Sequence, residues 1–77
     1  MNIKYDLEYR QLGLKIAYYR KLSGLTQEQL AEKIDKSAAF IGHVEAPNVD
    51  KAVSLDTLFA ISEALDVPAY KFLIFDN

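Results

Sequence analysis

Apolar residues in the first part of the chain recur at steps of three and four, which is the spacing of one face of an α-helix. Between residues 6 and 22, the positions that keep this spacing are Tyr9, Leu12, Ile16 and Tyr19. Gly24 lies just beyond and suits a helix end, because glycine accepts the left-handed backbone found there. The pattern therefore predicts a helix over about Asp6 to Leu22.

Two short amphipathic segments follow, and each begins with a residue that can cap a helix. Thr26 is a candidate N-cap, and Gln29 three residues later completes a capping box, which predicts a helix over about Gln27 to Ile34. Ser37 is a second candidate N-cap and predicts a helix over about Ala38 to Glu45. The residues expected to face inward from these segments are Leu25, Leu30, Ala31, Ile34, Ile41 and Val44.

The second half of the chain predicts a loop and two more helices. The loop spans Pro47 to Lys51, and Ser54 caps the helix that follows it. The apolar face of that helix is expected to consist of Leu55, Leu58, Ile61, Ala64 and Leu65. Pro68 marks the next boundary, and a short fifth helix is expected over about Ala69 to Leu73. No run alternates long enough to predict a strand, so the fold class is all-α.

Composition indicates one small domain over residues 1–77. With 77 residues and 51% hydrophobic content, the chain can bury a single modest core. It has no cysteine, which excludes disulfides and thiolate-bound metal. No window approaches the roughly 20 apolar residues of a membrane span, so a soluble cytoplasmic protein is expected.

Charge is unevenly distributed, although the net charge of −2 argues mildly against a nucleic-acid partner. Residues 1–36 contain seven basic and five acidic side chains, whereas residues 37–77 contain two basic and six acidic ones. The positive half includes the first of the two short helices.

The chain offers little for enzymatic chemistry. One histidine, no cysteine and no glycine-rich phosphate loop leave no basis for a nucleophile, a metal site or a cofactor pocket. No catalytic residue, metal or cofactor is therefore expected.

The stretch from Leu14 to Leu73 resembles the phage-repressor and Cro-type helix-turn-helix family, also called the XRE family. Three strings carry the resemblance: Arg20-Lys21-x-x-Gly24-Leu25-Thr26-Gln27-x-x-Leu30-Ala31, Ser37-x-x-x-Ile41-x-x-Val44-Glu45 and Ser54-Leu55-x-Thr57-Leu58-x-x-Ile61-x-x-Ala64-Leu65-x-Val67. The resemblance implies a compact five-helix lambda-repressor-like domain with its helix-turn-helix at about residues 26–45. It also implies a sequence-specific, repressor-like transcriptional regulator of bacterial or phage origin that binds double-stranded operator DNA.

The resemblance also assigns roles to individual residues. Gln27 and Lys36 are expected near phosphates, and Arg20 and Glu45 are expected to form a structural ion pair. The positions expected to face the major groove are Ser37, Ala38, Ala39, Gly42 and His43. Phe40 and Asn48 are expected near the DNA backbone. Four of these residues have an ordinary structural alternative: core packing for Phe40, and a solvated surface position for Gln27, Lys36 and His43.

The predicted reading helix has an unusual composition, which leaves a second function open. Ala38 and Ala39 offer only methyl contacts, and Asp35 stands where the family commonly has glycine. Aspartate tolerates left-handed geometry but adds negative charge near the DNA side. The alternative is a helix-turn-helix used mainly for protein interaction or dimerisation, as in an antitoxin or a regulator's partner.

The apolar C-terminus predicts a homodimer through residues 70–77. Phe72, Ile74 and Phe75 are the expected interface residues, because an exposed apolar edge on a small domain usually marks an interface. Such a dimer would hold two recognition helices about 34 Å apart, one turn of DNA. The alternative is that Ile74 and Phe75 fold back against Ile3, Leu7 and the first helix.

Overall fold

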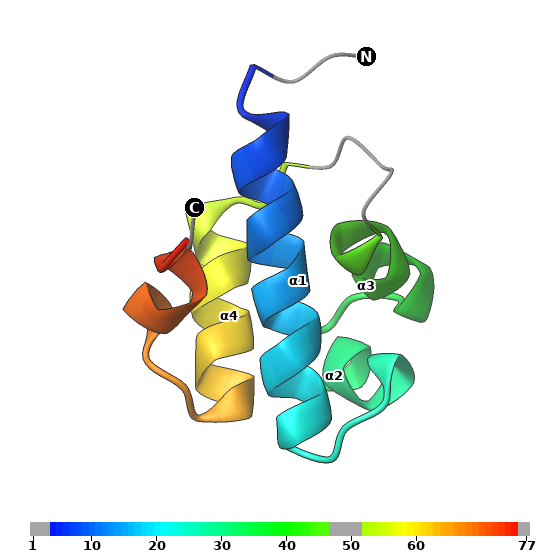
Figure 1. Ribbon diagram of the computed structural model, residues 1–77. Helices are drawn as coiled ribbons and strands as arrows, with labels where there is room; N and C mark the ends of the chain where they lie inside the picture. The colour runs from blue at the N-terminus through cyan, green and yellow to red at the C-terminus, as the bar shows by residue number, and fades with distance from the viewer. Residues whose placement is uncertain (1–3, 47–51, 76–77) are drawn as a thin grey trace.

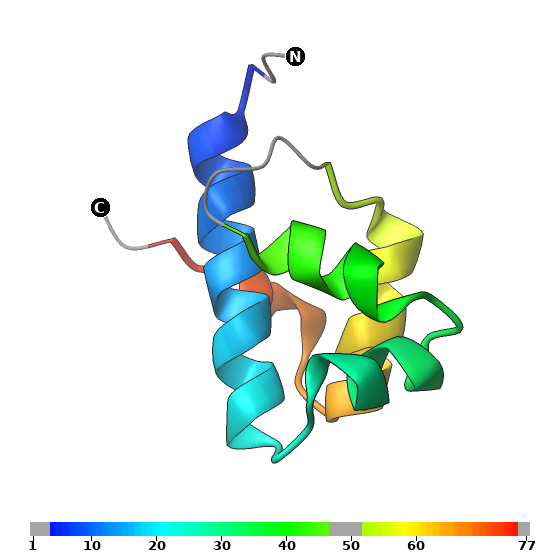
Figure 2. The same cartoon turned by 90° about the vertical axis from the view of Figure 1, so that its right-hand side faces the viewer.

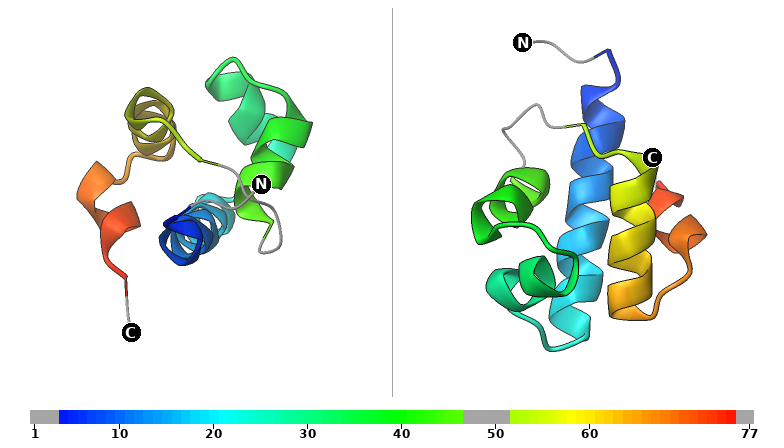
Figure 3. Two further views of the ribbon diagram at one scale, coloured as in Figure 1. Left: turned by 90° about the horizontal axis from the view of Figure 1, so that it is seen from above. Right: turned by 180° about the vertical axis from the view of Figure 1, so that it is seen from behind.

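The computed structural model of the chain describes residues 4–46 and 52–75. It contains four α-helices, α1 (Asp6–Leu22), α2 (Gln27–Lys33), α3 (Ala38–Glu45) and α4 (Leu55–Leu65), followed by a 3₁₀ helix, η1 (Ala69–Leu73). The long helix α1 runs through the middle, with α2 and α3 on one side and α4 and η1 on the other (Figure 1). The view from above in Figure 3 shows the same division.

The observed elements match the predicted ones in order and place, with two corrections. Helix α2 ends at Lys33, one residue earlier than expected. The expected short fifth helix is present as a 3₁₀ helix of five residues after Pro68, so the described residues contain four α-helices rather than five. Tighter 3₁₀ bonding is common in pieces this short. No strand occurs in residues 4–46 or 52–75, and no helix there is long and apolar enough to cross a membrane.

Side-chain caps explain where three of the helices begin. The Gln29 N–H donates to Thr26 Oγ1 at 3.0 Å, and the Thr26 N–H donates to Gln29 Oε1 at 2.9 Å, which completes the predicted capping box. The Ser37 hydroxyl oxygen accepts from the Phe40 N–H at 3.0 Å, and Ser54 caps α4 in the same way. Each bond satisfies a backbone donor that the first helical turn leaves unpaired.

A residue with left-handed backbone follows three of the helices. Gly24, Asp35 and Asp66 have φ angles of 77°, 58° and 55° after α1, α2 and α4. After α2, the Lys36 N–H donates to the Ala31 carbonyl at 2.9 Å, the bond of a Schellman motif. Asp35 therefore adopts the left-handed geometry expected at its position, and this sharp stop lets α3 start soon after α2.

The core lies between α1 and the two pairs of elements around it. Its buried side chains are Leu12, Ile16, Leu30, Ala31, Ile41, Val44, Leu58, Ile61, Leu65 and Phe72. The Phe72 ring meets the Tyr19 ring edge to face at 5.2 Å between centroids, which fixes η1 against α1. Leu55 was expected on the inner face of α4 but is 62% exposed, because it lies at the first turn, beyond the core.

Candidate nucleic-acid interface

Helices α2 and α3 pack closely and present one end of α2 beside one face of α3. Their contact is the most extensive between any two elements of the described fold. Ala31 is buried on α2 and its small side chain permits the close crossing. Figure 2 shows the two helices together at the front of the molecule, joined by the short turn at residues 34–37. This is the geometry of a helix-turn-helix.

The two faces of α3 differ sharply in chemistry. Ile41 and Val44 are buried in the core, whereas Ala39 and His43 are exposed on the opposite side. Gly42 lies between Ala39 and His43 along the helix and adds no side chain. The outward face is therefore nearly flat, with one imidazole that can donate or accept a hydrogen bond.

Arg20 connects α1 to the end of α3 through a buried ion pair. Its Nε donates to Glu45 Oε2 at 2.7 Å and its Nη2 donates to Glu45 Oε1 at 3.0 Å, while Nη1 donates to the Leu25 carbonyl at 2.8 Å. The two side chains are only 9% and 6% exposed. The ion pair expected between these residues is present, and its two parallel bonds fix the relative orientation of the helices.

Gln27 joins this network, which the sequence did not reveal. Its Nε2 donates to Glu45 Oε1 at 3.0 Å. A Cβ added at Gly42 would meet Gln27 Oε1 at 3.7 Å, so the amide oxygen lies next to the flat face of α3. The first residue of α2 is thus held beside the outward face of α3, where backbone N–H groups and the positive helix end favour an anion.

The turn between the helices carries charges of both signs. Lys36 is exposed, and its ammonium lies 5.4 Å from the centre of the Phe40 ring. Phe40 is half-buried and packs against the core, as its structural alternative anticipated. Asp35 is exposed beside them, so the turn has one cation and one anion near the expected DNA side.

The remaining expected DNA-facing residues have different environments. Ser37 is exposed, and because its oxygen accepts the capping bond, its hydroxyl proton remains available to donate. Ala38 is half-buried at the start of α3. Asn48 lies outside the described residues. The structure therefore places Gln27 beside Gly42 and Glu45 of α3, and Lys36 in the turn that precedes α3.

The C-terminal apolar residues divide between the core and the surface, which corrects the expected interface. Phe72 is fully buried, so its side chain has no surface to offer a partner. Phe75 is half-buried and packs against the core, which agrees with the fold-back alternative for this residue alone. Of the partners expected there, Leu7 is 58% exposed and Ile3 lies outside the described residues. Ile74 stays 49% exposed, and its exposed neighbours are Tyr70 and Leu73.

Gly13 is a structural position that sequence reasoning missed. It is buried where α1 approaches the end of α3, and an added Cβ would overlap the backbone carbonyl of Val44. A glycine inside a strongly periodic helix was the available signal, because it lowers helix propensity unless another backbone needs the space. This close approach brings Arg20 within reach of Glu45.

Comparisons with known proteins agree with this geometry. A family profile described as helix-turn-helix matches residues 16–72. The crystal structure of the restriction-modification controller protein C.AhdI from Aeromonas hydrophila is similar, with a TM-score of 0.82, 24% identity, and 91% of this chain and 99% of that chain covered. The crystal structure of the hypothetical transcription factor NHTF from Neisseria is also similar, with a TM-score of 0.78 and 23% identity, and with 96% of this chain and 84% of that chain covered. At these identities the two structures establish likeness of fold. No curated protein matches the sequence.

Proposed function

This chain belongs to the XRE-type helix-turn-helix family of DNA-binding transcription regulators, and we propose that it acts as a repressor-like regulator that occupies operator DNA. It would work in the bacterial cytoplasm, by blocking access to the operator and without chemistry of its own. The observation that supports this most directly is the placement of Gln27 beside the flat outward face of α3.

The geometry favours α3 as the element that enters the major groove. Small residues at positions 38, 39 and 42 allow the helix backbone to come close to the base edges. His43 can donate to guanine O6 or N7, and Ala39 can contact a thymine methyl group. Gln27 and Lys36 are the side chains that we propose as phosphate contacts.

Sequence readout should therefore depend on few polar contacts. We expect His43→Ala to relax the preference for the selected site by about 1–3 kcal/mol, the value of one good base contact. Gln27→Ala should weaken selected and random DNA alike, because a phosphate contact carries no sequence information. Fluorescence anisotropy with a duplex selected from a random pool, and with a scrambled duplex, measures both effects. Thermal unfolding of each variant checks that it remains folded.

The alternative function makes the opposite forecast for the same titration. If no duplex binds at low ionic strength, the domain acts through protein interaction and the operator proposal fails. If DNA binds but His43→Ala affects all sequences equally, the histidine contacts the backbone and another residue reads the bases.

We also propose a homodimer through the surface formed by Tyr70, Leu73 and Ile74. All three side chains are exposed, and they lie in or directly after η1 at the C-terminal end of the fold. Because η1 packs on the side of α1 remote from α2 and α3, such a dimer leaves both recognition helices free (Figure 1). A dimer would let two half-sites be read at once, which offsets the sparse contacts of one α3.

Ile74→Glu tests the dimer, and Leu14→Glu is its matched control. Leu14 is similarly exposed, at 57% compared with 49% for Ile74, but lies on α1. Light scattering should show a dimer for the unaltered chain and for Leu14→Glu, and a monomer for Ile74→Glu. A monomer in all three samples across the accessible concentration range would refute the dimer.

A further inference from the structure

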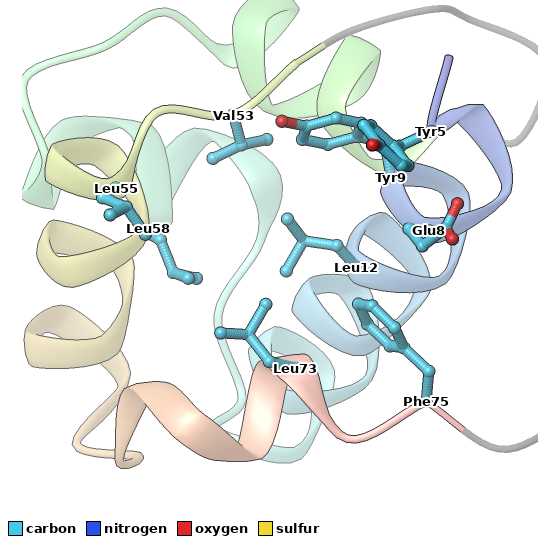
Figure 4. Close-up of a pocket in the computed structure, with 9 residues that line it drawn as sticks. All are labelled: Tyr5, Glu8, Tyr9, Leu12, Val53, Leu55, Leu58, Leu73 and Phe75. Carbon is cyan, nitrogen blue, oxygen red and sulfur yellow. The ribbon is translucent and has the colours of Figure 1, made fainter. Parts of the chain in front are cut away.

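A pocket of about 270 Å³ lies at the end of the molecule where α1 and α4 begin and the chain ends (Figure 4). Leu12 and Leu58 line its inner part, while Val53, Leu73 and Phe75 form its walls. The first turns of α1, together with the residue before that helix, contribute Tyr5, Glu8 and Tyr9 to the lining. None of the lining residues belongs to α2 or α3, so the pocket is separate from the proposed DNA face.

The size and lining of the pocket suit a small apolar group. An apolar cavity of about 150 Å³ is large enough to bind benzene in an engineered protein, so this larger space has room for a bicyclic ring. Figure 4 shows the Phe75 ring extending from the C-terminal segment toward Leu12. Aromatic side chains at the wall and rim favour an aromatic ligand, because rings pack edge to face with one another.

Glu8 gives the pocket a single ionisable acidic group. Its carboxylate has no hydrogen bond or ion pair within residues 4–46 and 52–75, whereas the neighbouring carboxylate of Asp6 lies 3.6 Å from Arg10. All the other lining residues are aliphatic or aromatic. The positive head group of a ligand would pair with Glu8, while its apolar body filled the inner part of the pocket beside Leu12 and Leu58.

The tyrosine rings beside Glu8 reinforce this choice of charge. Aromatic faces attract cations, and aromatic rings are a recurrent surrounding of bound ammonium groups. The Lys4 ammonium already lies 5.5 Å from the centre of the Tyr5 ring. Lys4 is exposed on a short segment before α1, so it acts as a competitor that a ligand ammonium would displace from Tyr5.

We propose that this pocket binds a small organic cation, an aromatic or branched apolar body carrying an ammonium group. The inference does not rest on the proposed function, because it concerns a surface remote from α3 and is tested without DNA. A second copy of the chain inserting an apolar side chain is the competing occupant, and the experiment separates the two.

Three indole compounds with the same ring and different head groups provide the test. Tryptamine is a cation, tryptophol is neutral and indole-3-acetate is an anion. The chain contains no tryptophan, so indole fluorescence anisotropy reports the ligand alone when the full chain is titrated in. We expect tryptamine to bind about fivefold more tightly than tryptophol, the gain of a partly exposed charge pair, and indole-3-acetate to bind most weakly.

Variants assign the preference to named groups. Glu8→Gln should remove the preference for tryptamine over tryptophol and leave tryptophol affinity unchanged. Glu63→Gln is the matched control, an exposed carboxylate on α4 that does not line the pocket, and should preserve the preference. Lys4→Gln should tighten tryptamine binding, because it removes the competing ammonium.

Several outcomes would overturn the proposal. Absence of binding, equal binding of all three compounds, or a tryptamine preference that survives Glu8→Gln would each show that the pocket is not a cation site. A second copy of the chain is the natural occupant, and the proposal is wrong, if two results occur together. The first is that ligand affinity falls as protein concentration rises. The second is that tryptamine dissociates the dimers of both the unaltered chain and Leu14→Glu, as measured by light scattering.

Discussion

The inner face of α3 is held by several independent contacts, whereas its outer face carries mostly methyl groups and a glycine. On the inside, Ile41 and Val44 are buried, and the Arg20–Glu45 pair joins the helix end to α1. On the outside, only His43 has a polar side chain beyond the capping residue. Contacts that position the helix and contacts that would read DNA therefore reside on different residues.

This separation implies that stability and recognition respond to different substitutions. Changes on the inner face should lower the free energy of unfolding, and changes on the outer face should alter DNA binding with little effect on folding. Gln27 is the exception, because it bonds to Glu45 on the inside and lies beside Gly42 on the outside.

Arg20→Ala should cost about 3–5 kcal/mol of unfolding free energy, because it leaves the buried Glu45 carboxylate without its cation. Arg10→Ala is the control: its pair with Asp6 is solvent-exposed, at 49% and 46% for the two side chains, and should cost at most about 0.5 kcal/mol. Urea unfolding followed by circular dichroism measures both. Similar losses for the two variants would show that the buried pair does not hold α3 in place.

Gly13→Ala should destabilise the fold by about 1–3 kcal/mol, because the new Cβ overlaps the Val44 carbonyl and α1 must move away from α3. Gly42→Ala is the same chemical change on the outer face, where the added Cβ meets only Gln27 Oε1 at 3.7 Å. It should stabilise α3 by about 0.5–1 kcal/mol, since alanine is the better helix former. Thermal unfolding compares the pair, and a gain at both positions would contradict the close approach.

Lys36→Gln should reduce the slope of log affinity for DNA against log salt concentration by about 0.9, the value for one phosphate contact. Lys71→Gln removes the same charge from η1, on the other side of α1, and should leave the slope nearly unchanged. Anisotropy titrations at several salt concentrations measure the slopes. Equal reductions would place the DNA elsewhere than across the α2–α3 turn.

Asp35→Gly should have a small effect on folding, a gain of up to about 1 kcal/mol, because glycine adopts the left-handed conformation without strain. It should also strengthen DNA binding by removing a negative charge beside Lys36. Gly24→Ala adds a Cβ to a residue with a φ of 77° and should lower the free energy of unfolding by about 1–2 kcal/mol. A loss of stability in Asp35→Gly would mean that the aspartate side chain makes a stabilising contact in the turn.

Local signals made the helices readable from the sequence. Thr26, Ser37 and Ser54 each cap the helix that they were expected to cap, because an N-cap acts on backbone groups two or three residues away. Asp35 adopts the left-handed backbone that its place in the turn required. These features depend on the nearest residues in the chain, so a single sequence contains the necessary information.

Contacts between distant segments were harder to anticipate. Phe75 was expected at a dimer surface, but it packs against the core and lines the pocket with Tyr5 and Leu12. Its direction depends on how η1 docks on α1, and no local pattern encodes that angle. The bond from Gln27 to Glu45 was missed for the same reason, since 18 residues separate the two side chains in the chain.

By itself, the sequence determined the order of the helical segments, the limits of the two motif helices to within one residue, and the small, weakly polar character of α3. These follow from periodicity, capping and side-chain chemistry, which act over a few residues. The tertiary structure decided which apolar side chains remain exposed, how Gly13 lets α1 meet α3, and where the pocket opens. Those properties arise only when packed helices exclude some side chains from water and leave others at the surface.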